Sequence, residues 1–175
     1  MRRLLGLTFV PLLLIPTAAI AQSTPTPVER QQAITANPFL LLGGWFNVEY
    51  ERRINPTTTW GLSGSLAELE NFKYRSAKFL FRYYPQEAAL SGLFIGGRTG
   101  IYRVDEDTGA FLFGTQDTKL FFALGVELGY TWLLGREHRF AISLGGGLSR
   151  LFGGDLEDAP LTIPNIRLVN IGVAF

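Results

Sequence analysis

Six charged residues stand at alternating positions that would bring their side chains together in the interior of a β-structure. Three are acidic and three are basic: Glu49, Glu51, Lys78, Arg82, Arg98 and Glu127. Charges withdrawn from water are tolerated when they are paired and hydrogen-bonded, so equal numbers of each sign favour a matched ionic network. Paired carboxylates could also serve acid–base catalysis, but neighbouring cations would keep them ionised. We therefore predict a charge network that plugs an interior.

The sequence contains no residue pattern that is typical of nucleophilic catalysis. The sequence contains no cysteine, and its one histidine, His138, falls in a predicted short turn. A serine nucleophile needs a base beside it. Outer-membrane lipid A deacylases use a histidine and a serine two residues apart in a strand, whereas Phe140 stands two residues after His138. We expect no catalytic residues and predict that the protein is not an enzyme.

Metal and phosphate motifs are also incomplete. The segment 105–109 (DEDTG) is similar to the start of a calcium loop, but Gln116 stands where that loop needs a glutamate. The glycine clusters at 96–97 and 145–147 lack the Lys-Ser/Thr pair of a phosphate loop. They are expected to be packing or curvature positions inside strands. No metal and no cofactor is predicted.

The first 21 residues have the pattern of a cleaved export signal. Arg2 and Arg3 precede an apolar run over residues 4–15, and Ala19-Ile20-Ala21 supplies small residues before Gln22. The run is shorter than the ~20 apolar residues of a membrane-spanning helix. We expect cleavage after Ala21, a flexible lead-in over residues 22–31, and one domain over residues 32–175.

The charge of the remaining chain is close to neutral. Removing Arg2 and Arg3 from the 16 basic residues leaves 14, against 15 acidic residues. A nucleic-acid-binding protein would carry a basic face, so no nucleic-acid partner is expected. The chain has no cysteine and therefore no disulfide, and no later run of residues is apolar enough for a spanning helix.

Large apolar residues alternate with small or charged ones, and this pattern predicts that the charged residues lie in strands. In residues 120–134 every second residue is large and apolar, and the residues between them are mostly small. A soluble β-sandwich also alternates, but its polar face carries many charged and threonine side chains. A face of Gly, Ala and Ser with a few isolated charges fits the crowded interior of a narrow barrel. The pattern favours strands that face lipid on one side.

Seven strands are read directly from this alternation, and an eighth from the even strand number of bacterial single-chain barrels. The predicted strands cover residues 32–40, 45–53, 58–67, 74–84, 90–104, 120–134, 140–148 and 169–175. Short turns are expected at 55–57, 85–88 and 135–138, and longer loops at 68–73, 105–118 and 155–164. The first strand contains Pro38, which is awkward in a hydrogen-bonded ladder. The predicted fold is an all-β, eight-stranded, antiparallel, up-and-down transmembrane β-barrel.

Several segments resemble those of small bacterial outer-membrane β-barrel families. The resemblance rests on residues 37–44 (NPFLLLGG) leading into 47–52 (NVEYER), on 81–84 (FRYY) and on the terminal Phe175. The chain is similar in architecture to the OmpA membrane domain and OmpX. The resemblance implies an outer-membrane location and recognition of Phe175 by the barrel-assembly machinery.

Three functions are compatible with such a barrel. The leading hypothesis is a structural or interaction protein whose acidic loops engage divalent cations, lipopolysaccharide or an extracellular partner. The loop acids are Asp105, Glu106, Asp107, Asp117, Asp155, Glu157 and Asp158. The second hypothesis is a small pore or transport protein, which requires continuous water in the lumen. The third is a lipid-modifying enzyme, for which the sequence offers no nucleophile–base pair.

Overall fold

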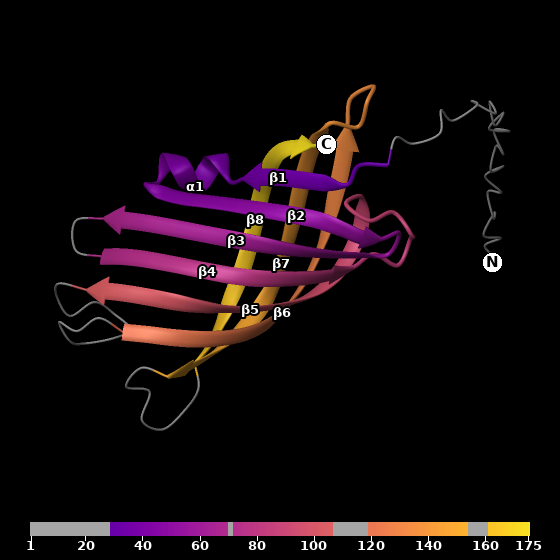
Figure 1. The fold of residues 1–175 in the computed structure, drawn as a ribbon. Helices are drawn as coiled ribbons and strands as arrows, with labels where there is room; N and C mark the ends of the chain where they lie inside the picture. The colour runs from indigo at the N-terminus through magenta and orange to yellow at the C-terminus, as the bar shows by residue number, and fades with distance from the viewer. Residues whose placement is uncertain (1–28, 70–71, 107–118, 154–160) are drawn as a thin grey trace, which may run out of the picture.

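A computed structural model of the chain describes residues 29–69, 72–106, 119–153 and 161–175. Eight antiparallel strands pair in sequence order and close into a barrel, because β1 pairs with both β2 and β8 (Figure 1). The strands are β1 (Gln32–Ala36), β2 (Trp45–Asn55), β3 (Thr58–Leu69), β4 (Phe72–Tyr83), β5 (Gly92–Glu106), β6 (Lys119–Leu134), β7 (Phe140–Gly153) and β8 (Thr162–Ala174). The predicted all-β, eight-stranded, up-and-down antiparallel barrel is confirmed.

The alternation read from the sequence matches the two faces of the wall. Successive side chains of a strand point to opposite faces, so one register decides every position along it. On β6, Val126 is 63% exposed whereas Glu127 is 4% exposed. The predicted outward residues of this strand, from Leu120 to Leu134 in steps of two, are all exposed.

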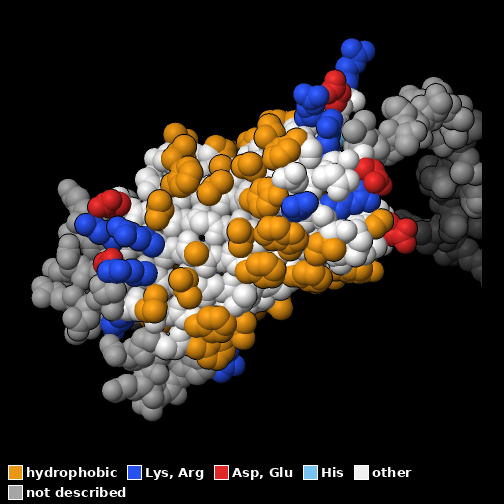
Figure 2. Space-filling view, viewed as in Figure 1, with side chains coloured by type: hydrophobic (Ala, Val, Ile, Leu, Met, Phe, Trp, Pro, Cys, Tyr) orange, Lys and Arg blue, Asp and Glu red, His pale blue; other side chains and the backbone are white. Residues whose placement is uncertain are grey.

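The outward side chains form a hydrophobic belt, by which we mean the exposed apolar residues around the middle of the barrel. It includes Leu62, Phe79, Ile101, Val126, Leu148 and Ile166, which come from six different strands. In Figure 2 hydrophobic side chains cover the middle of the visible wall, and charged side chains gather toward its two ends. A water-soluble monomer rarely exposes a continuous apolar surface larger than a few hundred Å².

The first strand is shorter than predicted. Residues 38–40, expected as its second half, instead begin the helix α1 (Pro38–Leu42). The Asn37 side chain caps this helix by accepting a hydrogen bond from the Leu40 backbone N–H at 3.0 Å. Proline suits the first turn of a helix, where its missing N–H is not needed, and disrupts a ladder. The prediction of strand over 38–40 was therefore wrong.

Other strand ends also differ from the prediction. β7 continues to Gly153 and β8 begins at Thr162, so both are longer than expected. β3 and β4 remain paired up to Leu69 and Phe72, so residues 68–69 and 72–73 of the predicted loop belong to these strands. Leu90 belongs to the turn before β5 instead of the strand, and its side chain is buried. Hydrogen bonds to neighbouring strands extend the strands beyond the residues whose apolar–polar alternation is visible in the sequence.

The barrel has two distinct ends. The turn end carries residues 55–57, 84–91 and 135–139 together with Phe175, and the loop end carries α1 and the opposite ends of the strands. Residues 29–31 of the predicted lead-in lie against the turn end, where the Gln31 backbone N–H donates to the Phe175 carbonyl at 3.0 Å. Arg53 pairs there with Glu29 at 2.8 Å, and its hydrogen bond and charge lower the pKa of the Glu29 carboxyl.

No helix among the described residues is long and apolar enough to cross a membrane. The predicted signal segment 1–21 and most of the lead-in 22–31 lie outside the described residues.

Candidate functional site

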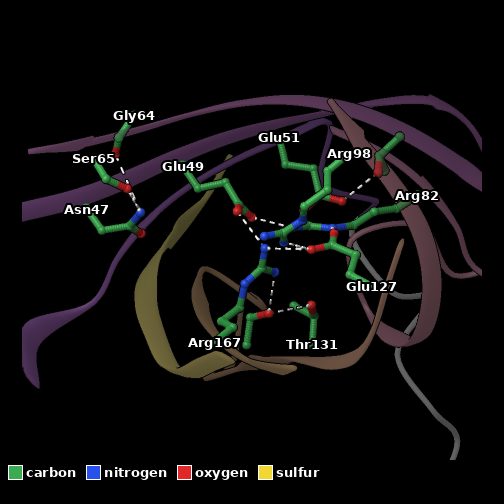
Figure 3. A network of polar contacts seen from close by, with 12 residues as sticks. Asn47, Glu49, Glu51, Gly64, Ser65, Arg82, Arg98, Glu127, Thr131 and Arg167 are labelled. Carbon is green, nitrogen blue, oxygen red and sulfur yellow. Dashed lines mark hydrogen bonds and ion pairs between the residues drawn. The ribbon is translucent and has the colours of Figure 1, made fainter. Parts of the chain in front are cut away.

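An ionic network centred on Arg82 occupies the lumen, with its members supplied by β2, β4, β5, β6 and β8 (Figure 3). The Arg82 guanidinium reaches three carboxylates: it lies 2.7 Å from Glu49, 2.5 Å from Glu127, and in contact with Glu51. All four side chains are buried. Guanidinium groups suit this role because their planar donors bind carboxylates at fixed angles. Four of the six predicted network residues therefore lie in direct contact.

Arg98 is the fifth predicted member and pairs with Glu127. Its side chain is 10% exposed, and its Nε atom is buried without a hydrogen-bond partner. Glu127 thus lies between two guanidinium groups, Arg82 on one oxygen and Arg98 on the other. The Arg98 guanidinium therefore keeps one buried donor that the network does not use.

Arg167 belongs to the network although the sequence prediction missed it. Its Nη2 atom lies 2.6 Å from Glu49 and 3.4 Å from Glu127. The prediction read the alternation of the last strand only from residue 169 and ended the preceding loop at residue 164, so Arg167 was given no face. The alternation of Ile163, Asn165 and Arg167 could have extended the strand backward, but the register shift between β7 and β8 interrupts this pattern.

Lys78 faces the lumen as predicted, but it lies beside the central network and not within it. Among the described residues it forms no ion pair, and its Nζ atom lies 5.4 Å from the centre of the Tyr102 ring. That distance is typical of a cation–π contact. The central network therefore holds three carboxylates and three guanidinium groups, with Arg167 in the place expected for Lys78.

Glu51 is fixed by two neutral partners as well. Thr59 and Tyr84 donate hydrogen bonds to its Oε1 atom at 2.5 and 2.7 Å. Its second oxygen contacts Arg82, so both carboxylate oxygens are satisfied. A buried charge is stable only when its remaining lone pairs find donors.

Glycines make room for these large side chains. A Cβ atom on Gly96 would lie 3.0 Å from the Arg82 Cγ and 3.1 Å from the Glu127 Cγ, and one on Gly125 would lie 3.1 Å from the Arg98 Cγ. Both glycines face the lumen beside the network. Such contacts are tighter than an ordinary van der Waals separation, so Gly96 packs closely as its predicted cluster implied, and Gly125, which was not predicted, does the same.

Apolar side chains close the lumen at the turn end. Tyr84, Ala89 and Phe94 form one buried cluster, and the Arg82 guanidinium lies 4.6 Å from the Phe94 ring centre. Leu90 is 1% exposed and packs with Ala33 and Ala174 in a second cluster. Together with the network, these buried residues occupy the turn-side half of the lumen.

The loop half of the lumen contains a cavity of about 280 Å³. The network residues Glu49, Arg98 and Arg167 line the cavity. Lys78 and Asn47 line it as well. Pockets that enclose small-molecule ligands begin at about 300 Å³, so this cavity is just below the size of a small binding site. A polar cavity of this size also has room for several waters.

The remaining predicted residues lie at the two ends of the barrel. His138 lies in the turn between β6 and β7, with its Nδ1 atom 3.2 Å from the Leu133 carbonyl oxygen. Phe175 is the exposed last residue, and its backbone N–H donates to the Gln32 carbonyl. Of the loop acids, Asp105 and Glu106 lie at the end of β5, and the others lie outside the described residues.

Neither a family model, a curated protein nor a solved structure matches this chain.

Proposed function

We propose that this chain is a non-enzymatic bacterial outer-membrane β-barrel with a plugged polar lumen, which serves a structural or interaction role through its outward loops. The observation that carries this proposal is the hydrophobic belt around a closed, charge-filled barrel. A ring of paired strands satisfies most backbone groups of its wall internally, as hydrocarbon requires. The belt supplies the apolar surface that such a wall presents to lipid.

The positions of the short turns and of Phe175 support one orientation of the barrel in the membrane. Bacterial barrels place short turns in the periplasm and longer loops outside the cell. The turns at 55–57 and 135–139 share one end with Phe175, so this turn end is proposed to face the periplasm. The loop end would then present its acids to divalent cations, lipopolysaccharide or a protein partner. The signal-like segment 1–21 is consistent with export to this location.

The proposal predicts a barrel that forms in lipid and resists detergent. Protein refolded into phosphatidylcholine vesicles should migrate differently on a gel before and after boiling, because pairing of the eight strands into a ring makes sodium dodecyl sulfate unfold the barrel slowly without heat. Circular dichroism of the unboiled sample should be of the β type.

The matched control is the same protein diluted from urea into buffer without lipid or detergent. It should aggregate, because the hydrophobic belt would face water. A monomer that stays in solution without detergent and lacks a heat-dependent gel shift would overturn the proposal.

A second prediction separates the plugged barrel from the pore hypothesis. Wild-type protein in planar bilayers should give no steady conductance, because Arg82 and the Tyr84–Phe94 cluster fill the cross-section of the lumen. The control is an established porin reconstituted in the same lipid. Persistent, ion-selective channels from the wild-type protein would replace the plugged barrel with a small pore.

A further inference from the structure

The wall of the barrel changes its construction between β2 and β8. β1 pairs with β8 only over Ala33–Ala36 and with β2 only as far as Val48. Beyond this point, in the loop half, β8 has no strand partner on its β1 side among the described residues. The helix α1 lies there instead and contacts both β2 and β8. Figure 1 shows α1 continuing from the tip of β1 along β2. One stretch of wall is therefore closed by side chains and not by a hydrogen-bonded ladder.

The 280 Å³ cavity lies directly behind this stretch of wall. Its lining includes Leu40 of α1 and Pro164 and Ile166 of β8. Ile166 is 68% exposed on the outward face and also borders the cavity, so the wall beside α1 is thin at this position. The residues that border the cavity on this side, Leu40, Pro164 and Ile166, are apolar, and the proposed function places this side in lipid.

The inner end of the cavity is cationic. Lys78 has no carboxylate partner among the described residues, and the Arg98 Nε atom is buried without an acceptor. Arg167 and Glu49 also line the cavity, but they are paired with each other at 2.6 Å. An ammonium without an ion-pair partner and an unused guanidinium donor at one end of a cavity call for an anionic oxygen ligand.

The volume limits what can enter. A cavity of about 280 Å³ is smaller than the range of sites that enclose a drug-sized molecule. It can hold an anionic head group and a few methylene groups. The rest of a longer ligand must lie outside the cavity, beside the apolar residues of α1 and β8. The shape and the charges together describe an amphiphile with a compact anionic head.

We propose that this cavity binds the anionic head group of a single-chain lipid, such as a fatty acid, that enters sideways from the membrane past α1. The inference rests on the proposed membrane location. Lys78 and Arg98 bind the head group, and the acyl chain lies along the outer wall beside Leu40 and Ile166.

Trp45 provides a reporter for this site, because it lines the cavity and packs on Tyr74 with ring centres 4.7 Å apart. The other tryptophans, Trp60 and Trp132, belong to the outward faces of β3 and β6, where bulk lipid would also quench them. The experiment therefore uses the full chain with Trp60→Phe and Trp132→Phe, refolded into phosphatidylcholine vesicles. Dibrominated stearate is titrated in, and quenching of Trp45 fluorescence is recorded.

Dibrominated stearate is expected to quench Trp45 along a saturating curve, and dibrominated stearyl alcohol along a weaker, linear one. Lys78→Gln should raise the half-saturating concentration about tenfold, the loss expected for one charge-assisted hydrogen bond. Lys73→Gln is the matched control, because Lys73 lies on the same strand with its side chain exposed on the outward face. It should leave the curve unchanged.

Unbrominated stearate should relieve the quenching, whereas acetate and inorganic phosphate at equal concentration should not. Equal linear quenching by the acid and the alcohol, or an equal effect of both lysine variants, would overturn the inference. Relief by acetate or phosphate as effective as that by stearate would also overturn it, because a free anion would then suffice. The gel shift on boiling is measured on the same samples, so failure to form a membrane barrel is distinguished from failure to bind the lipid.

Discussion

Arg82→Met is expected to cause the largest loss of stability of any single substitution in the lumen. It removes the group that contacts Glu49, Glu51 and Glu127. Breaking a buried ion pair on one side costs about 3–5 kcal/mol, because the partner charge stays buried without compensation. The free energy of unfolding, measured by urea titration of the vesicle-bound protein with the gel shift as readout, should fall by about this amount.

The partners of the three carboxylates make this prediction more specific. Glu49 retains Arg167, and Glu127 retains Arg98. Glu51 has no other cationic partner than Arg82 among the described residues. The double variant Arg82→Met, Glu51→Gln should therefore be more stable than Arg82→Met alone. The difference gives the cost of the unpaired Glu51 charge, as in a double-mutant cycle.

Arg75→Met is the matched control. Arg75 lies on the same strand as Arg82, with its side chain exposed on the outward face. Its replacement should change the free energy of unfolding by no more than about 0.5 kcal/mol, as for most surface substitutions. Similar losses for both arginines would show that the lumen network does not stabilise the barrel.

Val126→Arg is expected to be the most damaging substitution on the outer wall. Val126 is 63% exposed in the middle of β6, at the centre of the hydrophobic belt. An arginine at the middle of a bilayer costs a transmembrane barrel about 2–4 kcal/mol, and the cost falls to about 0–1 kcal/mol near the interfaces. Refolding yield into vesicles and the urea midpoint should both decrease.

Leu120→Arg makes this test depend on membrane depth. Leu120 lies on the same strand and the same face, is 60% exposed, and stands near the loop end. A wall in lipid predicts a small effect at Leu120 and a large one at Val126. A wall in water predicts almost no effect at either position, since both side chains would already be solvated. Equal and small effects would contradict the membrane location.

The sequence alone was enough to predict the class of fold and the two faces of the wall. A strand has a side-chain period of two, so Leu120 to Leu134 reveals its outward face without any knowledge of its neighbours. The same rule placed Glu49, Glu51, Arg82 and Glu127 inside the barrel from the sequence alone. Local geometry suffices to predict the face that a side chain occupies, because successive side chains of one strand point to opposite faces.

The partners of each charge were decided only by the tertiary structure. Glu49 and Arg167 are 118 residues apart, and they meet because the barrel closes and sets the relative register of β2 and β8. Lys78 obeys the inward pattern, but its Nζ atom lies 5.4 Å from the centre of the Tyr102 ring and forms no ion pair among the described residues. Alternation records which face a side chain occupies and carries no information about its height along the barrel.

The stretch of wall between β2 and β8, where α1 replaces a strand, could likewise not be predicted from the sequence pattern. Pro38 indicated that the first strand would be weak, but not that Asn37 would cap a helix there. Nor could alternation reveal the cavity behind α1, which depends on β1 ending at Ala36 while β2 and β8 continue. A strand's face follows from its own residues, whereas a cavity exists only where several separate segments leave space between them.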